Sequence, residues 1–139
     1  MADKRAARLK TVPLFTHCDG KQLDFIATQV EEMDFPAGRV LCTEGSFGGD
    51  FFILETGTAD VTRGGKRIAT MKPGDFFGEI ALVDGGRRTA TVTTSAPSRC
   101  FVLGPQQFQN VLHQNVEIIH AVMKALATRV RDAGAAKAD

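Results

Sequence analysis

Residues 76–92 read FFGEIALVDGGRRTATV, and this stretch decides the fold. A carboxylate, Glu79, lies between two phenylalanines and the apolar run 80–82, where an unpaired charge would be costly. Nine positions later Arg88 opens a Thr-rich alternating segment that is typical of a strand. Gly78 removes a side chain just before the carboxylate, so the backbone there can approach another group closely. The two charges at this separation predict a small polar site in an apolar setting.

The chemistry around Glu79 and Arg88 suits a molecule that carries both a phosphate and hydroxyl groups. Residues 80–84 are long enough for one helical turn, and its free amides together with one guanidinium would attract a phosphate. A carboxylate repels a phosphate but accepts hydrogen bonds from a sugar hydroxyl. A nucleotide offers both groups, and a single arginine fits the single charge of a cyclic phosphodiester. The alternative is a surface ion pair worth about 0–1 kcal/mol.

Outward from this stretch, turns containing glycine or proline recur at short intervals between residues 33 and 104. They separate apolar runs of about five residues, a punctuation typical of antiparallel strands. FFILET (51–56) is expected to be a buried strand, and Gly64-Gly65 is a two-residue hairpin signal. The pattern predicts a mainly β fold, a β-roll (jelly roll or double-stranded β-helix) of about eight antiparallel strands.

Helical periodicity flanks the strands on both sides. Residues 1–32 are predicted to be helical, with Asp19 capping a segment of apolar residues at helical spacing. Two helices are predicted after the last strand, over 105–113 and 115–131. The second has four apolar residues as its expected core stripe: Ile119, Met123, Leu126 and Val130. We expect one domain over 1–139, comprising N-terminal helices (1–32), a β-roll (33–104) and C-terminal helices (105–136).

Composition and charge exclude several classes of protein. The 139 residues carry 17 basic and 16 acidic side chains, a balance that disfavours direct nucleic-acid binding. The N-terminal basic residues (Lys4, Arg5, Arg8 and Lys10) are interpreted as a solvated helix face, with an acidic partner surface as the alternative. No leader and no membrane segment is recognised, and three widely spaced cysteines suit a reducing interior, so a cytoplasmic location is expected.

No catalytic or metal-binding pattern is recognised. The three histidines (His17, His113 and His120) fall outside the predicted strands, no CxxC pair occurs, and no nucleophile elbow is present. We therefore expect no metal, no cofactor and no enzymatic activity.

The stretch 76–92 is similar to the phosphate-binding cassette of cyclic nucleotide-binding domains, the family of the cAMP receptor protein, protein kinase A regulatory subunits and cyclic nucleotide-gated channels. The family pattern is close to F-G-E-[LI]-A-L followed by R-x-A-[TS]-V, and residues 77–82 and 88–92 match it without insertion. The resemblance extends to Gly38, to Glu44-Gly45, to the approach at 49–52 and to Gly57. The Walker A motif is absent from the sequence, which disfavours a nucleoside triphosphate.

The resemblance implies a binding site for cAMP or cGMP. By resemblance Arg88 pairs with the phosphate, Glu79 accepts from the ribose 2′-hydroxyl, and Gly78 admits the sugar. Thr89 bears on the choice of base, and the expectation leans slightly to cAMP. Arg129 stands where some bacterial members place an arginine over the base, a plain helix charge being the alternative. The whole expected ligand-binding set is Phe77, Gly78, Glu79, Ile80, Ala81, Arg88, Thr89, Ala90 and Arg129.

The resemblance also implies an output. Family members signal by movement of the C-terminal helices, here toward an unknown effector protein or domain. No reading head of the helix-turn-helix type follows in RDAGAAKAD (131–139), so contact with DNA is not expected. Arg87 departs from the family, which often has proline or a small residue there, and is interpreted as facing solvent. The alternative function is a non-catalytic interaction protein with a vestigial nucleotide pocket.

Overall fold

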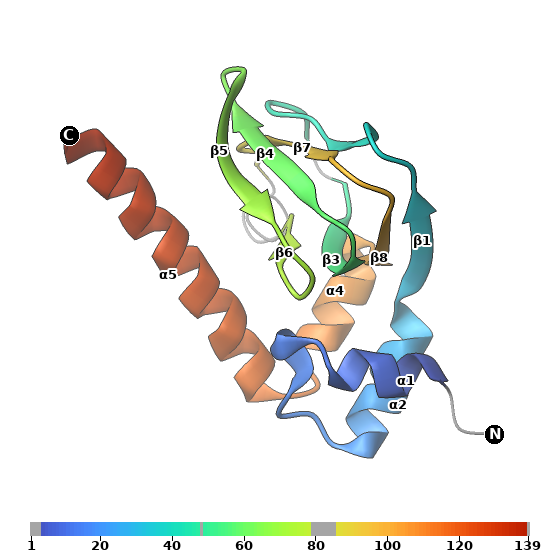
Figure 1. Ribbon diagram of the computed structural model, residues 1–139. Helices are drawn as coiled ribbons and strands as arrows, with labels where there is room; N and C mark the ends of the chain where they lie inside the picture. The colour runs from blue at the N-terminus through green and yellow to red at the C-terminus, as the bar shows by residue number, and fades with distance from the viewer. Residues whose placement is uncertain (1–3, 48, 79–85, 139) are drawn as a thin grey trace.

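A computed structural model of the chain describes residues 4–47, 49–78 and 86–138, with side chains described as far as residue 131. In these ranges eight antiparallel strands form two four-stranded sheets (Figure 1). One sheet has the order β1 (Glu31–Phe35), β8 (Ser98–Leu103), β3 (Phe51–Thr56) and β6 (Phe76–Phe77). The other has the order β2 (Val40–Cys42), β7 (Thr91–Thr94), β4 (Ala59–Arg63) and β5 (Lys66–Met71). The predicted β-roll of about eight antiparallel strands is confirmed.

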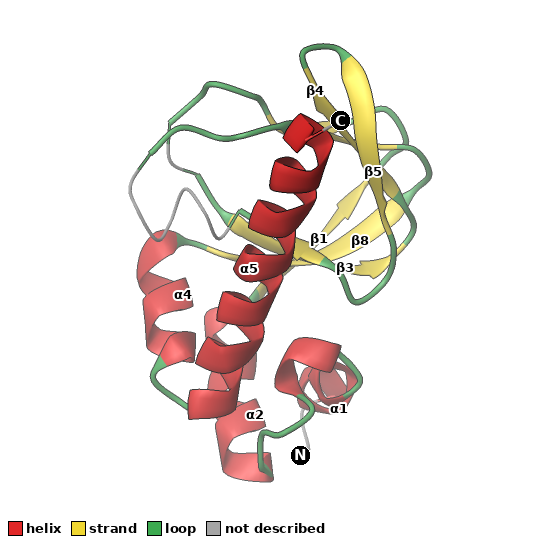
Figure 2. Ribbon diagram, turned by 90° about the vertical axis from the view of Figure 1, so that its left-hand side faces the viewer, coloured by secondary structure: helices red, strands yellow, loops and turns green. Residues whose placement is uncertain are grey.

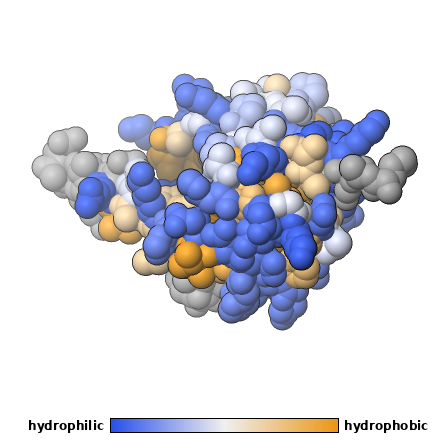
Figure 3. All heavy atoms as spheres, turned by 90° about the horizontal axis from the view of Figure 1, so that it is seen from below, coloured by the Kyte–Doolittle hydropathy of each residue, from blue (hydrophilic) through white to orange (hydrophobic). Residues whose placement is uncertain are grey.

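The helices gather on one side of the first sheet. They are α1 (Lys4–Lys10), the short 3₁₀ helix η1 (Pro13–Phe15), α2 (Gly20–Gln29), α4 (Pro105–Leu112) and α5 (Val116–Ala138). Figures 1 and 2 show α1, α2 and α4 forming a base below the strands, while α5 rises from this base along the side of the molecule. Seen from below, the surface of the base is mostly hydrophilic, with small separate hydrophobic areas (Figure 3).

Two features predicted from local sequence are present: the cap that starts α2 and the tight turn between β4 and β5. Asp19 accepts from the Gln22 backbone N–H, and the Gln22 side chain accepts from the Asp19 N–H, a capping box that starts α2. Gly64 and Gly65 have φ values of 60° and 78° and join β4 to β5. A two-residue turn of this hand requires glycine-like backbone angles at both positions, which is why the Gly-Gly pair makes a tight hairpin.

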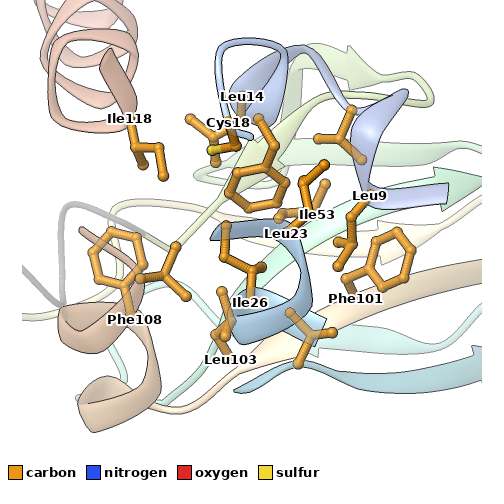
Figure 4. Close-up of a cluster of buried hydrophobic side chains, with 14 of the residues drawn as sticks. Leu9, Leu14, Cys18, Leu23, Ile26, Ile53, Phe101, Leu103, Phe108 and Ile118 are labelled. Carbon is orange, nitrogen blue, oxygen red and sulfur yellow. The ribbon is translucent and has the colours of Figure 1, made fainter. Parts of the chain in front are cut away.

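Strand β3 divides the core into two parts because both of its faces are apolar. Phe51 and Ile53 belong to the larger cluster, which the helices cover. Figure 4 shows this cluster with side chains from the helical base meeting residues of β3 and β8. Phe52 and Leu54 belong to the second cluster, which lies between the sheets. FFILET is buried along its first four residues, as its sequence predicts.

The structure corrects three expectations about the helices. The change from helix to strand comes at Glu31, slightly earlier than the 32/33 boundary. The buried face of α5 is formed by Ile118 and Val122, whereas Ile119, Met123 and Val130 of the expected core stripe are exposed, and Leu126 is partly buried. The sequence holds two apolar stripes offset by one residue, and the neighbours of α5 decide which one is buried.

The third correction concerns Arg5 and Arg8, two of the four basic residues expected to form a solvated helix face, whereas Lys4 and Lys10 are exposed as expected. Arg8 makes ion pairs with Glu32 and Glu55, from β1 and β3. Arg5 also pairs with Glu32 and donates to the backbone carbonyls at the end of α2. Lys10 donates to the Thr16 and Cys18 carbonyls. Arg5 and Arg8 hold α1 against the sheet, and Lys10 binds it to the turn before α2, so the helix is docked by charge as well as by its buried Leu9.

Candidate functional site

The candidate site is built around Arg88, which lies just before β7 and is 5% exposed. The loop between β2 and β3 runs antiparallel beside it. Gly45 donates its backbone N–H to the Arg88 carbonyl oxygen at 2.9 Å, and the Arg88 N–H donates to the Ser46 carbonyl oxygen at 2.7 Å. This short ribbon fixes the backbone of Arg88 and directs its side chain inward, beneath the same loop.

The Arg88 guanidinium is held by backbone atoms and is only partly satisfied. Its Nη2 donates to the Asp50 carbonyl oxygen at 2.6 Å, whereas its buried Nη1 has no hydrogen-bond partner among the described residues. A buried N–H without an acceptor costs free energy. A fixed cation with a donor to spare is therefore suited to receive an anionic oxygen.

Two glycines make room for this guanidinium. A Cβ added at Gly49 would lie 2.6 Å from Nη2, and one added at Gly78 would lie 2.7 Å from Nη1. Their φ values, +93° and +103°, lie in the region that favours glycine. Arg88 therefore occupies a cradle that a side chain on either glycine would fill.

The other expected residues of the cassette that the structure describes differ in how far they are exposed. Gly78 is half-buried, Ala90 is buried and Thr89 is exposed. The Thr89 carbonyl oxygen accepts from Arg63 Nε at 2.8 Å, which ties it to the β4–β5 hairpin. The expected contributions of Glu79, Ile80 and Ala81, and of the helical turn over 80–84, lie outside the described residues.

Phe77, also expected in the ligand-binding set, has its side chain in the core between the sheets. It is buried, and its ring stacks on that of Phe52 with the centroids 4.9 Å apart and an interplanar angle of 11°. A ring in this position anchors β6 to β3 and fixes where Gly78 begins. Its position favours a structural role over direct contact with a ligand.

Arg129, expected over a base, is engaged by β6. Its Nη2 donates to the Phe76 carbonyl oxygen at 2.6 Å, and its guanidinium carbon lies 5.7 Å from the centroid of the Phe76 ring. Burial lowers the pKa of the Arg129 guanidinium, and the Asp75 carboxylate opposes that shift. In this structure Arg129 links α5 to the strand that leads into the cassette.

The sequence did not predict that Gly49 and Asp50 complete the site. In the sequence, the run 48–50 predicts a turn and forms part of the family resemblance. What it could not reveal is that the Asp50 carbonyl faces a guanidinium 38 positions away. The sequence also did not predict that Glu44 links the β2–β3 loop to β7 and to the β4–β5 hairpin. Its N–H donates to Thr91 Oγ1, and its carboxylate accepts from the Gly64 N–H.

Metal-binding groups, membrane-spanning helices and disulfides were sought among the described residues. They contain no group of three or more His, Cys, Asp or Glu side chains that could hold a metal ion. Among them no helix is long and apolar enough to cross a membrane. The cysteines are free thiols, with Cys18 and Cys100 buried.

Comparison with protein families matches residues 32–115 to the cyclic nucleotide-binding domain. The cAMP-dependent protein kinase regulatory subunit of Yarrowia lipolytica is 35% identical over 106 residues, which are 75% of this chain and 28% of that protein. The potassium/sodium hyperpolarization-activated cyclic nucleotide-gated channel 3 of Mus musculus is 30% identical over 123 residues, 88% of this chain and 16% of the channel. The chain thus spans about a quarter of the kinase regulatory subunits that it matches.

Solved structures share the fold. A cAMP-bound PfPKA-R structure superposes with a TM-score of 0.81 at 25% identity, over 94% of this chain and 46% of the other. The catabolite activator protein of Thermus thermophilus superposes with a TM-score of 0.78 at 24% identity, over 88% of this chain and 60% of the other. At that identity the second likeness concerns the fold alone.

Proposed function

Because the chain belongs to the cyclic nucleotide-binding domain family, we propose that it binds cAMP at Arg88, with a slight preference over cGMP. The observation that carries the proposal is the buried Arg88 guanidinium, whose Nη1 lacks an acceptor among the described residues. A cyclic phosphate would supply that acceptor and the missing charge together. Its single negative charge matches the single cation of the cradle.

The remaining roles are those that the family resemblance implies, and we propose them for this chain. Gly78 leaves space for the sugar, and Glu79 accepts from the ribose 2′-hydroxyl. Ile80, Ala81, Thr89 and Ala90 surround the phosphate, with the Ala81 and Thr89 amides donating to it. The preference for cAMP is supported by the names of the relatives, which include several cAMP-dependent kinase regulatory subunits.

We propose that binding is passed to the C-terminal helices. Asp50, which holds Arg88, is followed by Phe51, and the Phe51 ring stacks on Phe108 of α4 with centroids 4.4 Å apart. Phe51 also contacts Phe76 at 5.5 Å, and Phe76 contacts Arg129 of α5. A shift of the loop at Asp50 therefore acts on side chains that touch both helices.

The exposed apolar residues of α5 support a second position for this helix. Met123 is 59% exposed and Val130 is 70% exposed, although both are large apolar side chains on a helix that also packs against the core. A movement that covers them would gain apolar burial, about 25 cal/mol for each Å² removed from water. A ligand can favour that movement only through a higher affinity for the covered state. In this proposal the chain acts on an effector, which is a protein or a further domain, and catalyses no reaction itself. The free thiols agree with a cytoplasmic setting.

The test is a parallel calorimetric titration of the chain with cAMP and cGMP, repeated on Arg88→Ala. We expect binding in the wild type and a loss of about 2–5 kcal/mol in the variant, the usual cost of removing one member of a desolvated charge pair. Arg67→Ala is the matched control, because Arg67 is exposed on β5 and lies 3.9 Å from Asp60, its ion-pair partner. Equal affinity of Arg88→Ala and wild type would contradict the assigned role. If neither nucleotide gives heat or raises the melting temperature of the wild type, the vestigial-pocket alternative is favoured.

A further inference from the structure

Arg87 and Phe47 form an exposed pair directly outside the cradle. Phe47 is 66% exposed, and the Arg87 guanidinium carbon lies 4.3 Å from the centroid of its ring. Arg87 Nη1 donates to the Gly45 carbonyl oxygen at 3.0 Å, and Phe47 and Arg87 form an isolated antiparallel bridge. Arg87 does face solvent, as its sequence position suggested, yet it binds the loop between β2 and β3 at two points.

The same loop holds Arg88 from the other side. Arg87 binds its outer part at Gly45 and Phe47. In its inner part, Gly49 leaves room for the Arg88 guanidinium and the Asp50 carbonyl accepts from it. The two neighbouring arginines thus contact described residues of the same loop, Arg87 at 45 and 47 and Arg88 at 49 and 50. The distance between the Asp50 oxygen and Nη2 depends on where that segment sits.

We propose that Arg87 is a positioning residue for the phosphate site, acting through its contacts with Gly45 and Phe47 and not by touching the ligand. By clamping Gly45 and Phe47, Arg87 holds Gly49 and Asp50 where they fix the Arg88 guanidinium. The inference rests on the proposed function, because it concerns the affinity of the site built on Arg88. It also gives a reason for an arginine at a position where the resemblance leads one to expect proline or a small residue.

The contact between Arg87 and Phe47 limits how much affinity its removal can cost. A cation over an aromatic ring at an exposed site, together with one exposed hydrogen bond, stabilises the position of the loop only modestly. We expect Arg87→Ala and Phe47→Ala to weaken cyclic nucleotide binding about three- to tenfold, far less than Arg88→Ala. Arg87→Lys keeps a cation that can lie over the ring and is expected to recover part of the loss.

The experiment is a set of calorimetric titrations with cAMP on the wild type, Arg87→Ala, Phe47→Ala and the double variant. If the two residues act as one clamp, the double variant loses no more affinity than either single variant. In an Arg88→Lys background, which lacks the guanidinium donor to Asp50, Arg87→Ala is expected to change affinity less than about twofold. A purely structural role would give the same loss in both backgrounds and would overturn the inference.

Phe47→Trp adds an independent readout, because the sequence contains no Trp and no Tyr. The indole retains the cation contact, so its emission reports the position of the loop with and without cAMP. Phe47→Leu removes the ring face but keeps an apolar side chain, and serves if Arg87→Ala does not fold. Arg67→Ala again controls for loss of a surface charge. Unchanged affinity in Arg87→Ala or Phe47→Leu overturns this inference alone, whereas a wild type that binds neither cAMP nor cGMP overturns the proposed function.

Discussion

Arg88 and Asp50 are 38 positions apart in sequence, yet the Arg88 Nη2 donates to the Asp50 backbone oxygen at 2.6 Å. The bond uses a carbonyl and not a carboxylate, so the positive charge of Arg88 is oriented without being neutralised by that partner. A cation held in this way at 5% exposure stays available to an anionic ligand. The glycines beside it then become the most sensitive positions of the site.

Gly78→Ala is predicted to damage both stability and binding. The added methyl group would lie 2.7 Å from Arg88 Nη1 and 2.6 Å from the Asp50 carbonyl oxygen, and the φ of +103° disfavours any side chain. We expect a loss of about 2–4 kcal/mol in the free energy of unfolding, measured by urea denaturation. The methyl group of Gly49→Ala would meet only the end of the Arg88 side chain, so beyond the backbone strain of its φ of +93° its main effect is expected on cAMP affinity.

The control for Gly78→Ala is Gly38→Ala. Gly38 has a φ of +83°, but a Cβ there would meet no atom within 4 Å. Its replacement should therefore show the backbone strain alone, about 1–2 kcal/mol, with unchanged affinity. Equal losses of affinity in the two variants would show that the space around Arg88 is not what makes Gly78 necessary.

The sequence predicts those parts of the fold that depend on near neighbours. Asp19 and Gln22 form their capping box, and Gly64-Gly65 forms its hairpin, because the hydrogen bonds or backbone angles involved span only a few residues. These features are readable because local chemistry and tertiary structure agree.

Features set by distant partners could not be read in this way. Arg5 and Arg8 have the appearance of surface charges until Glu32 and Glu55 are brought beside them by the sheet. The face of α5 was ambiguous because stripes offset by one residue both have helical spacing. The role of Gly49 depends on a loop pairing with the cassette, and no periodicity encodes that pairing.

Arg8→Ala is predicted to loosen the N-terminal helix. Arg8 pairs with Glu32 and Glu55, whose side chains are 13% and 15% exposed, and its loss leaves these carboxylates with Arg5 and Arg99 alone among the ion pairs of the described residues. Since Arg8 itself is 40% exposed, we expect a loss of about 1–2 kcal/mol, less than for a fully buried pair.

Urea denaturation of Arg8→Ala beside Lys4→Ala measures this effect, since Lys4 is exposed on the same helix. The difference between wild type and Arg8→Ala should narrow at about 1 M salt, where the screening length falls to about 3 Å. A difference that does not respond to salt would assign the loss to packing of the Arg8 side chain, whose guanidinium carbon lies 5.9 Å from the centroid of the Phe101 ring.

Cys100 is predicted to make the protein less stable at alkaline pH. Burial raises the pKa of its thiol from 9.0 to about 12. The folded state therefore keeps the proton between pH 9 and 12, whereas the unfolded state releases it, so stability falls as pH rises. At pH 10 the loss from this group is about 1 kcal/mol. The measurement is the slope of unfolding free energy against pH, which should be shallower in Cys100→Ala. Equal slopes in both proteins would place the titration elsewhere, for instance at Cys18 or Cys42, whose pKa values burial also raises.

Arg129→Ala is predicted to release α5 from β6. The variant loses the 2.6 Å hydrogen bond to the Phe76 carbonyl and the contact with the Phe76 ring, so hydrogen exchange should become faster in the part of α5 that follows Val122. Arg131→Ala is the control, because Arg131 is exposed two positions further along the same helix. If Arg129 also covers the base of bound cAMP, its removal weakens binding by a further amount of about 0.5–2 kcal/mol. Faster exchange with unchanged affinity would keep the anchor to Phe76 and reject the contact with the base. Unchanged exchange would reject the anchor itself and leave the packing of Ile118 and Val122 as the attachment of α5.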